Sequence, residues 1–466
     1  MKIKSLSIIS FHSWKKLIRK APTRSGLSIV SFALMCGWIL ICLPAIAAVP
    51  PPIRNGCNVR IGAFLRSGTG PDGKLSAADR VWIAHHLDIV ALNPPSLAPT
   101  DFPAMQAMNP RLICLLRLDA SGIDPSGSDR VSNWHPSLQK WDIKVPRKLA
   151  GPQYRLMNPA SMKWAEYWRD AAARLVARYH AHGVVADHLP TDRYSLFDRV
   201  GAYRNETNRV KATRSWLKTV KQNRNYMLVA AANGFAAPAE ENTPYIDWLV
   251  TLAGSLWNDF DSLVNGVFVK GWQSWGSTGT MQNERDWEIN TASAQRFSRQ
   301  GRAYLAIASF KDQTELESLI ACYLMAYHTG CRFSLEPVPT SAFREDGSIR
   351  LADLKAVYYR YNALFSVSLG RPLRDRFRVH DGKWRYWVRP FEKGMVVCNP
   401  SDQNGVVVSF GQPLERVGGG KVQQLVLQSH SGVVLMYPST KTKPASGPTQ
   451  KKATDSDSAT PAKNRS

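Results

Sequence analysis

The sequence predicts an α/β fold, a (β/α)8 TIM barrel followed by a small C-terminal antiparallel β-domain. Eight short runs that are apolar on both faces alternate with helical patterns between residues 59 and 337. Strands of this kind are typical of a parallel sheet covered by helices, and eight βα units close a barrel. From about Arg371 onward, short alternating strands are separated by turn dipeptides at hairpin spacing, which predicts the β-domain.

The predicted barrel strands can be placed along the chain by their apolar runs. They are residues 59–65, 86–93, 111–119, 183–187, 226–233, 265–272, 303–310 and 331–337. Periodic segments between them carry apolar residues at helical spacing. The chain therefore repeats one βα unit.

Two of the intervening helices have readable ends. Asn158 is expected to cap a helix that Gly183 ends. Asp312 with Glu315 forms a capping-box pattern ahead of a second helix, which Gly330 is expected to close. Each helix leads into the next strand, as the αβ step of a barrel requires.

Composition changes divide the chain into four parts. Asp-Gly, Asn-Gly and Ser-Gly pairs mark the turns of the β-domain, and the segment after Tyr437 is rich in Ser, Thr, Pro and Lys without periodicity. The predicted parts are a signal peptide or membrane anchor at 1–47, the barrel at 48–365, the β-domain at 366–437 and a disordered tail at 438–466.

The amino terminus has the pattern of a secretory leader. A basic segment leads into an apolar run that ends on small residues at Ala45, Ala47 and Ala48. This predicts an exported protein, periplasmic or extracellular. Because the apolar length is borderline for a membrane span, association with the membrane through an uncleaved anchor is the alternative.

The formal net charge of +24 does not predict a nucleic-acid partner. The leader carries seven of these charges and the tail four, so the body holds thirteen spread over its whole length. No block of five adjacent basic residues occurs. A mildly basic, solvated surface is the expectation.

Cysteine and motif content predicts neither a metal nor a cofactor. The five cysteines after the leader have no metal-ligand spacing, and the chain lacks H-E-x-x-H, P-loop and G-x-S-x-G motifs. Cys114 and Cys398 are expected in the core. A bridge involving Cys322 and Cys331 is left open.

Polar side chains stand where several predicted strands end, and in a barrel the active site lies at the carboxyl ends of the strands. Alternation places these side chains on the inward face, which predicts a polar pocket. They are Arg66, Arg117, Asp119, Asp187, Asn233, Lys270 and Glu336. The alternative for Asp187 is a structural ion pair with Arg66 or Arg117, or a helix cap. His188, next to Asp187, is expected to face the other way.

Two tryptophans follow the sixth strand in the segment GWQSWGSTG. Trp272 and Trp275 stand in a Gly/Ser-rich context, where flat rings can stack on the C–H faces of sugars. The alternative is that both tryptophans pack onto the interface between the two domains.

Three segments support a family resemblance. MKWAEYWRDAAARLVARYHAHGVVADHLP, NGVFVKGW and GMVVCNPS make residues 58–437 resemble the glycoside-hydrolase-like proteins of family 15, and more distantly the barrel endo-α-galactosaminidases. The resemblance implies a carbohydrate polymer as substrate and a pair of catalytic carboxylates, with Asp187 at the position of the strand-four aspartate. Lys270 stands where the family tends to have a glutamate, and a lysine cannot serve as a catalytic carboxyl.

These observations predict a glycoside hydrolase that acts on an exported polysaccharide or oligosaccharide. Asp187 is expected as base or nucleophile, since Lys270 lowers its pKa, with Glu336 as acid and Asp119 as the next candidate. The remaining residues are expected to bind substrate: Arg66, Arg117, Asp119, Asn233, Lys270, Trp272 and Trp275. The alternative is a catalytically inactive barrel that binds an acidic polysaccharide during its assembly or export.

Overall fold

The structure, a computed structural model, describes a defined part of the chain. The described residues are 57–123, 142–143, 155–189, 205–222, 224–233, 260, 262–275, 280–281, 283–344 and 347–438. The predicted leader and nearly all of the predicted tail lie outside them. Among the described helices, none has the length and apolar character needed to span a bilayer.

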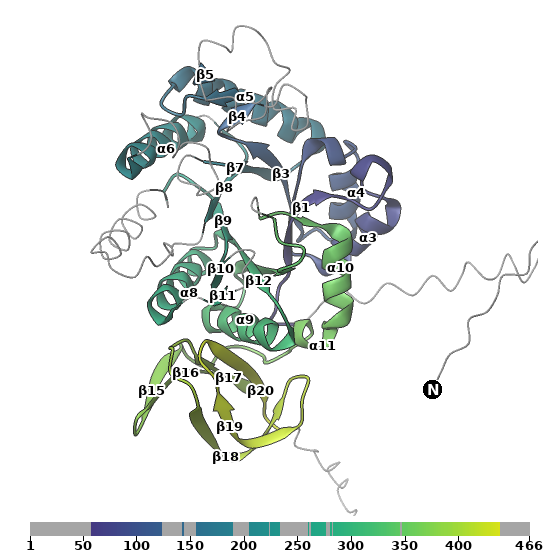
Figure 1. Cartoon of the computed structure of the whole chain (residues 1–466). Helices are drawn as coiled ribbons and strands as arrows, with labels where there is room; N and C mark the ends of the chain where they lie inside the picture. Colours follow the sequence, from purple (N-terminus) through teal and green to yellow (C-terminus); the bar gives the residue numbers. More distant parts are fainter. Residues whose placement is uncertain are drawn as a thin grey trace, which may run out of the picture. The chain divides into compact units, whose positions relative to one another are not determined.

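A parallel sheet forms the body of the fold (Figure 1). All eight predicted barrel strands are present, which confirms the α/β barrel. They are β1 (Gly62–Ser67), β2 (Ile89–Leu92), β3 (Ile113–Asp119), β7 (Gly183–Asp187), β8 (Met227–Asn233), β9 (Gly266–Lys270), β12 (Ala303–Phe310) and β13 (Arg332–Pro339). Each pairs in parallel with the next along the chain.

The sheet returns to its first strand. Ile61, just before β1, forms a parallel bridge with Leu335 of β13, and the amide of Leu335 donates to the carbonyl of Arg60 at 2.9 Å. A ninth strand, β14 (Ile349–Arg350), pairs with the other side of β1. The order β13-β12-β9-β8-β7-β3-β2-β1-β14 is that of a barrel with one added edge strand.

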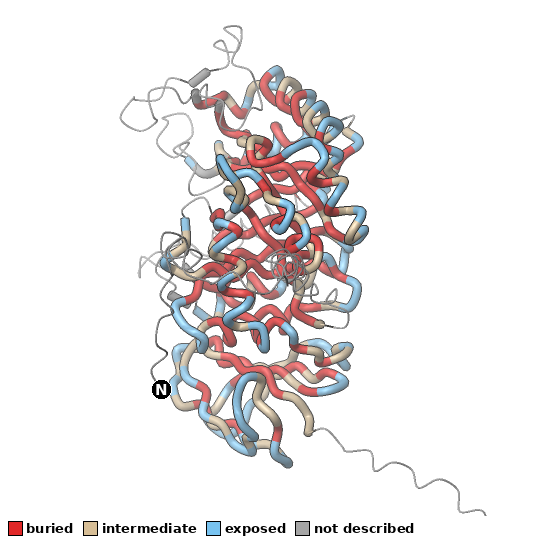
Figure 2. The backbone as a smooth tube through the Cα atoms, turned by 90° about the vertical axis from the view of Figure 1, so that its right-hand side faces the viewer, coloured by how far each residue is buried: buried red, intermediate tan, exposed pale blue. Residues whose placement is uncertain are grey.

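Strands β7, β9 and β12 are buried along their whole length, as the apolar runs predict. Figure 2 shows that buried backbone fills the interior of the described chain. Close packing explains a glycine that was expected to end a helix. Gly183 instead opens β7, where an added Cβ would lie 2.1 Å from the carbonyl oxygen of Met227. Only a residue without a side chain fits at this position, where β7 pairs with the start of β8.

Helix α5 spans Met162–Tyr179. It begins later than predicted and also ends earlier. Ser161, not Asn158, is the cap, and its hydroxyl accepts from the amide of Trp164. His180 ends the helix in the left-handed conformation, at φ 52°. A second cap-forming residue three positions after the first made the sequence ambiguous here.

Helix α9 (Gln313–Ala326) has the predicted cap. The carboxylate of Asp312 accepts from the amide of Glu315 at 3.0 Å, while Glu315 reaches back to the amide of Lys311. The helix ends at Ala326, so Gly330 lies in the turn beyond it, with φ 76°. The prediction of its start is confirmed, and the prediction of its end is wrong by one turn.

The remaining described elements surround the sheet or extend its loops. The helices are α3 (Ala77–His86), α4 (Asp101–Met108), α6 (Glu206–Lys221), α8 (Glu284–Arg299), α10 (Leu351–Arg360) and α11 (Asn362–Phe365), with 3-10 turns η3 (Pro71–Gly73) and η4 (Pro94–Ser96). The short strands are β4 (Gly122–Ile123), β5 (Asp142–Ile143), β6 (Arg155–Met157), β10 (Ser274–Trp275) and β11 (Thr280–Met281).

The predicted antiparallel β-domain follows the barrel. Its strands are β15 (Phe377–Asp381), β16 (Trp384–Phe391), β17 (Gly394–Asn399), β18 (Val406–Arg416), β19 (Lys421–Leu427) and β20 (Ser431–Met436), in the order β15-β16-β17-β20-β18-β19. The Asp381-Gly382 pair marks a hairpin, as predicted. The Ser-Gly pair does not, because Ser431 and Gly432 lie inside β20.

Helix α9 attaches the β-domain to the barrel. Residues 316–326 are all buried, because β17 and β20 contact this helix as well as the barrel strands β12 and β13. The buried guanidinium of Arg389 donates to the carbonyls of Leu324 and Met325 at 2.9 and 2.8 Å. These are among the carbonyls that a helix end leaves without a partner. Arg416 adds an ion pair with the buried Glu317.

The five cysteines of the described chain are free thiols. Cys114 and Cys398 are core residues, which confirms the prediction. Cys322 and Cys331 do not form a bridge. Cys322 instead accepts from the indole Nε1 of Trp287 at 3.0 Å.

Candidate active site

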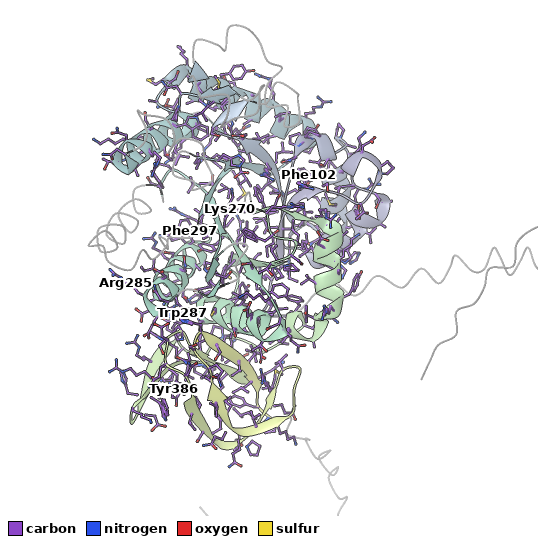
Figure 3. All side chains as sticks on the ribbon, in the orientation of Figure 1. Phe102, Lys270, Arg285, Trp287, Phe297 and Tyr386 are labelled. Atoms are coloured by element: carbon purple, nitrogen blue, oxygen red, sulfur yellow. The ribbon has the colours of Figure 1, made fainter. Side chains whose placement is uncertain are left out.

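A buried ion-paired carboxylate lies where three parallel strands end. Asp187 is the last residue of β7 and is 1% exposed. Arg117 of β3 donates to its Oδ2 through Nε at 2.8 Å and Nη2 at 2.7 Å. Lys270, the last residue of β9, donates to Oδ1 at 2.7 Å; its position among the barrel strands is labelled in Figure 3. The predicted convergence of these three residues is confirmed.

Strand register explains how distant positions meet here. Asp119 and Asp187 are directly paired across β3 and β7, so Arg117, two residues earlier, shares their face of the sheet. Lys270 reaches the carboxylate from β9, two strands away from β7. The backbone at Gly347 packs closely against the aliphatic part of the Lys270 side chain. A Cβ at Gly347 would lie 2.9 Å from Cγ of Lys270. The left-handed φ of 74° at Gly347 also favours glycine.

The cations fix the charge of Asp187. Burial alone would raise the pKa of its carboxyl, but the charges of His188, Lys270 and Arg117 outweigh burial and hold that pKa well below its usual range. Asp187 is therefore ionised at all physiological pH values. A permanently ionised carboxylate cannot serve as a proton donor.

His188 lies on the same side as the carboxylates, so the prediction that it faces away is wrong. Its φ of 53° is left-handed, which interrupts strand alternation directly after Asp187. Nδ1 lies 3.2 Å from Oδ2 of Asp119, and Nε2 lies 3.9 Å from Oδ2 of Asp187. Burial by itself would lower the pKa of His188, but the two carboxylates raise it to about 9. The imidazole is therefore protonated at neutral pH.

Asp119 and His188 are the more accessible members of this group. Their side chains are 14% and 25% exposed, compared with 1% for Asp187 and 0% for Lys270. Oδ1 of Asp119 accepts from the amides of Ser121 and Gly122, which fixes its orientation. We call Arg117, Asp119, Asp187, His188 and Lys270 the mouth cluster.

Glu336 lies at the same level of the barrel. In the register of β9, β12 and β13, Lys270 pairs with Ile307, which pairs with Glu336. Glu336 is fully buried, and its Oε2 accepts from the amide of Phe64 at 2.7 Å. The guanidinium of Arg117 lies over the ring of Phe64 in a cation–π contact, with its Cζ atom 4.3 Å from the ring centroid. Glu336 thus helps to hold β13 against β1, and its role as acid stays a prediction.

The other predicted site residues lie apart from the mouth cluster or outside the described side chains. Arg66 is exposed and lines a separate small cavity of about 140 Å³ with Arg344 and Asp353. Trp272 is fully buried and packs edge-on against Phe333, so it offers no exposed ring face for a sugar. The side chains of Asn233 and Trp275 lie outside the described ones.

No metal site is found among the described side chains, where His, Cys, Asp and Glu form no group of three suited to an ion. The segments that follow β4, β7, β8 and β10 continue into residues outside the description. The described part of the site is therefore a charged floor. It combines an ionised carboxylate, a second carboxylate and a protonated imidazole at the carboxyl end of an α/β barrel.

This combination defines a class, an α/β barrel with an ion-paired acidic cluster at its carboxyl-end mouth. No protein-family model matches the chain, and no curated protein matches it.

Solved structures similar to this chain include glycoside hydrolases. The glycoside hydrolase domain of PelA from Pseudomonas aeruginosa is 16% identical with a TM-score of 0.39, over 60% of this chain and 95% of that one. An alpha-amylase from Geobacillus thermoleovorans, complexed with acarbose, is 10% identical with a TM-score of 0.41, over 82% and 98%. The cyclic alpha-maltosyl-(1→6)-maltose hydrolase from Arthrobacter globiformis is 12% identical with a TM-score of 0.39, over 82% and 99%. These likenesses are too low to assign residues, and the family 15 and galactosaminidase resemblances stay predictions.

Proposed function

We propose that the protein is a glycoside hydrolase that acts on a polysaccharide at the mouth cluster. The observation that supports this most is that Asp119 and Asp187 are paired in register at the ends of β3 and β7 and that His188 contacts both carboxylates. Glycosidic cleavage needs an ionised group and a proton donor on either side of one bond. The cluster offers both within one strand spacing.

The roles follow from protonation and access. Asp187 supplies fixed negative charge, and Arg117 and Lys270 hold it in place. His188 is protonated at neutral pH and, with Asp119, is partly exposed, so this pair is placed to transfer protons. For Asp187 to attack a sugar directly, one of its oxygens would first have to lose its hydrogen bond to Arg117 or Lys270. We therefore assign proton donation to the leaving oxygen to His188. The Asp119 carboxylate is assigned to take a proton from the water molecule that forms the new bond to the anomeric carbon.

Binding of an acidic polysaccharide without cleavage is the second candidate function. It is favoured by one observation: both oxygens of Asp187 already accept from cations, and Lys270 occupies the end of β9. A carboxylate held in this way is typical of a structural ion pair as well as of a catalytic group. In this candidate function the mouth would hold a sugar chain and leave it intact.

We infer the cellular location from the leader alone. A basic segment, an apolar run and small residues at Ala45, Ala47 and Ala48 support export to the periplasm or beyond, where polysaccharides are assembled and remodelled. Retention of the leader would place the barrel at a membrane surface.

One experiment separates the two functions. Neutral, acidic and amino-sugar polysaccharides are incubated with the mature chain, and both reducing-end release and binding are measured. The hydrolase predicts release that falls at least a hundredfold in Asp119→Asn, with an unchanged circular dichroism spectrum. Because Asp187→Asn disturbs two cations and can impair folding, Asp119→Asn is the decisive variant. Saturable binding without release would support the second function, and neither binding nor release would contradict both.

A further inference from the structure

A larger cavity lies at the end of the barrel strands opposite to the mouth cluster. It has a volume of about 780 Å³ and is lined by residues at or before the amino ends of β1, β2, β3, β7, β8 and β13, together with Gly370, Arg371 and Glu392 of the β-domain. Its charged and titratable lining includes Arg60, Asp88, Arg111, His182, Arg332 and Arg371. This volume lies within the range of small-molecule sites, roughly 300–1,000 Å³. We call it the lower cavity.

We propose that the lower cavity binds a small anionic molecule through a carboxylate or phosphate group. The site is separate from the mouth cluster. His182 directly precedes β7 and Asp187 ends it, so five residues of strand, roughly 16 Å, separate the two along one strand. The proposal therefore does not depend on the glycosidase assignment.

The balance of charge in the lower cavity favours an anion. Arg371 is paired with Glu392 at 2.7 Å, and Arg60 approaches Asp88 at 3.9 Å. Arg111 and Arg332 have no acidic partner within the described part of the chain. Two guanidinium groups thus face one cavity with their charge uncompensated. Arginine donates in a planar fork that matches the oxygens of carboxylates and phosphates.

His182 adds a neutral donor to the lining. Its Nδ1 accepts from the backbone amide of Cys114 at 3.1 Å, which places the ring proton on Nε2. Nε2 has no partner among the described residues, so its N–H is available to a ligand. Partial burial and the charge of Arg332 lower the pKa of His182. An anion bound beside Arg332 would offset that charge and raise the pKa again.

The rigid scaffold around the cavity also suits a binding site. Most of the lining residues come from the starts of barrel strands or the turns before them, where the sheet fixes the backbone. His182 is held at both ends, since its amide donates to the carbonyl of Cys114 at 2.9 Å and its carbonyl accepts from Met227. Little ordering is therefore required when a ligand enters.

The test follows the imidazole of His182 by NMR while inorganic phosphate or galacturonate is added to the mature chain. His182→Gln identifies the signal. We expect a saturable shift with at least one of the two probes, and a higher pKa of His182 in the bound form. A response to phosphate alone would identify a phosphate ligand, and a response to galacturonate alone a carboxylate ligand.

Arginine variants give the matched comparison. Arg332→Gln and Arg111→Gln should each weaken binding about tenfold or more, because each removes a charge-assisted hydrogen bond. Arg174→Gln, at an exposed position of α5, should leave binding unchanged. Binding that is equally tight in all three variants would overturn the proposal. The proposal would also be overturned if the His182 signal did not respond to either probe at about 50 mM. A dissociation constant above that concentration would correspond to only very weak binding.

Discussion

Lys270 Nζ lies 2.7 Å from Oδ1 of Asp187, with both side chains almost completely removed from solvent. Each charge makes the burial of the other tolerable, since an isolated buried charge costs several kcal/mol. Lys270 therefore serves as a buried partner for the charge of Asp187. The pair also orders the end of β9 relative to β7 across the intervening β8.

Removing this ammonium should destabilise the fold strongly. Lys270→Met keeps the length of the side chain but leaves Asp187 with less compensation, so we expect a loss of about 3–5 kcal/mol in the free energy of unfolding. Urea denaturation at pH 7 measures this loss. Lys163→Met removes a lysine that is 73% exposed and should change stability by less than about 0.5 kcal/mol. Equal stability of the two variants would show that the buried pair contributes nothing.

A second buried carboxylate, Asp79, anchors the start of α3. It accepts from Thr69 and Ser76, and Lys355 of α10 donates to it at 2.6 Å. Burial would raise the pKa of Asp79, but Lys355 and these hydrogen bonds lower it well below its usual range. Its contribution to stability is therefore present above about pH 4 and is lost as the pH falls further.

We accordingly expect Asp79→Asn to lower the free energy of unfolding by about 3 kcal/mol at pH 7. The difference from the wild type should shrink below pH 4, because the wild-type carboxyl then takes up a proton. Asp170→Asn, at a side chain that is 55% exposed, is the control. A difference between wild type and Asp79→Asn that stays constant from pH 7 to pH 3 would contradict this account of Asp79.

The attachment of the β-domain should depend on Arg389. Burial lowers the pKa of this arginine to about 10, so it stays charged at pH 7 while it donates to two carbonyls at the end of α9. Arg389→Met leaves those carbonyls without their donor and should cost about 2–4 kcal/mol. Thermal unfolding followed by circular dichroism measures the effect. Arg371→Met, at a side chain that is 75% exposed, should be near neutral. An unchanged melting temperature for Arg389→Met would contradict the claim that Arg389 stabilises the attachment of the β-domain.

The sequence predicts the barrel well because its physical signal is strong. Most residues of the eight strands are buried, and apolar runs of this kind between helical segments are typical of a parallel sheet covered by helices. The meeting of Arg117, Asp187 and Lys270 follows from the same alternation. Helix ends are harder to predict, because Asn158 and Ser161 are equally good caps three residues apart.

His188 could not be placed from the sequence because it breaks the rule on which the prediction depends. Alternation holds only while the backbone stays extended, and the left-handed φ at His188 turns its ring toward Asp119. The one available signal was Pro190 two residues later, which indicates that the strand ends here. Arg66 lies apart from the mouth cluster for a related reason. The pairing of β1 with β14 shifts register between Leu65 and Ser67, so alternation does not hold at this position.

His188 should also make stability depend on pH. Its raised pKa means that its contribution is complete below pH 6.5 and is lost as the pH rises through about 9. We expect this contribution to be on the order of 2 kcal/mol. The difference in unfolding free energy between wild type and His188→Gln should fall between pH 6 and pH 10. His380→Gln, at an exposed position of β15, should show no such trend, and a flat difference for His188→Gln would contradict the assignment.

The most direct measurement is the NMR titration of the His188 imidazole in the wild type and in Asp119→Asn. The carboxylates of Asp187 and Asp119 beside the ring predict a pKa of about 9 for His188 in the wild type and a clearly lower value in Asp119→Asn. An ordinary pKa near 6.5 in both proteins would show that no charged pair of this kind exists at the barrel mouth, and the assignment of proton transfer to it would fall.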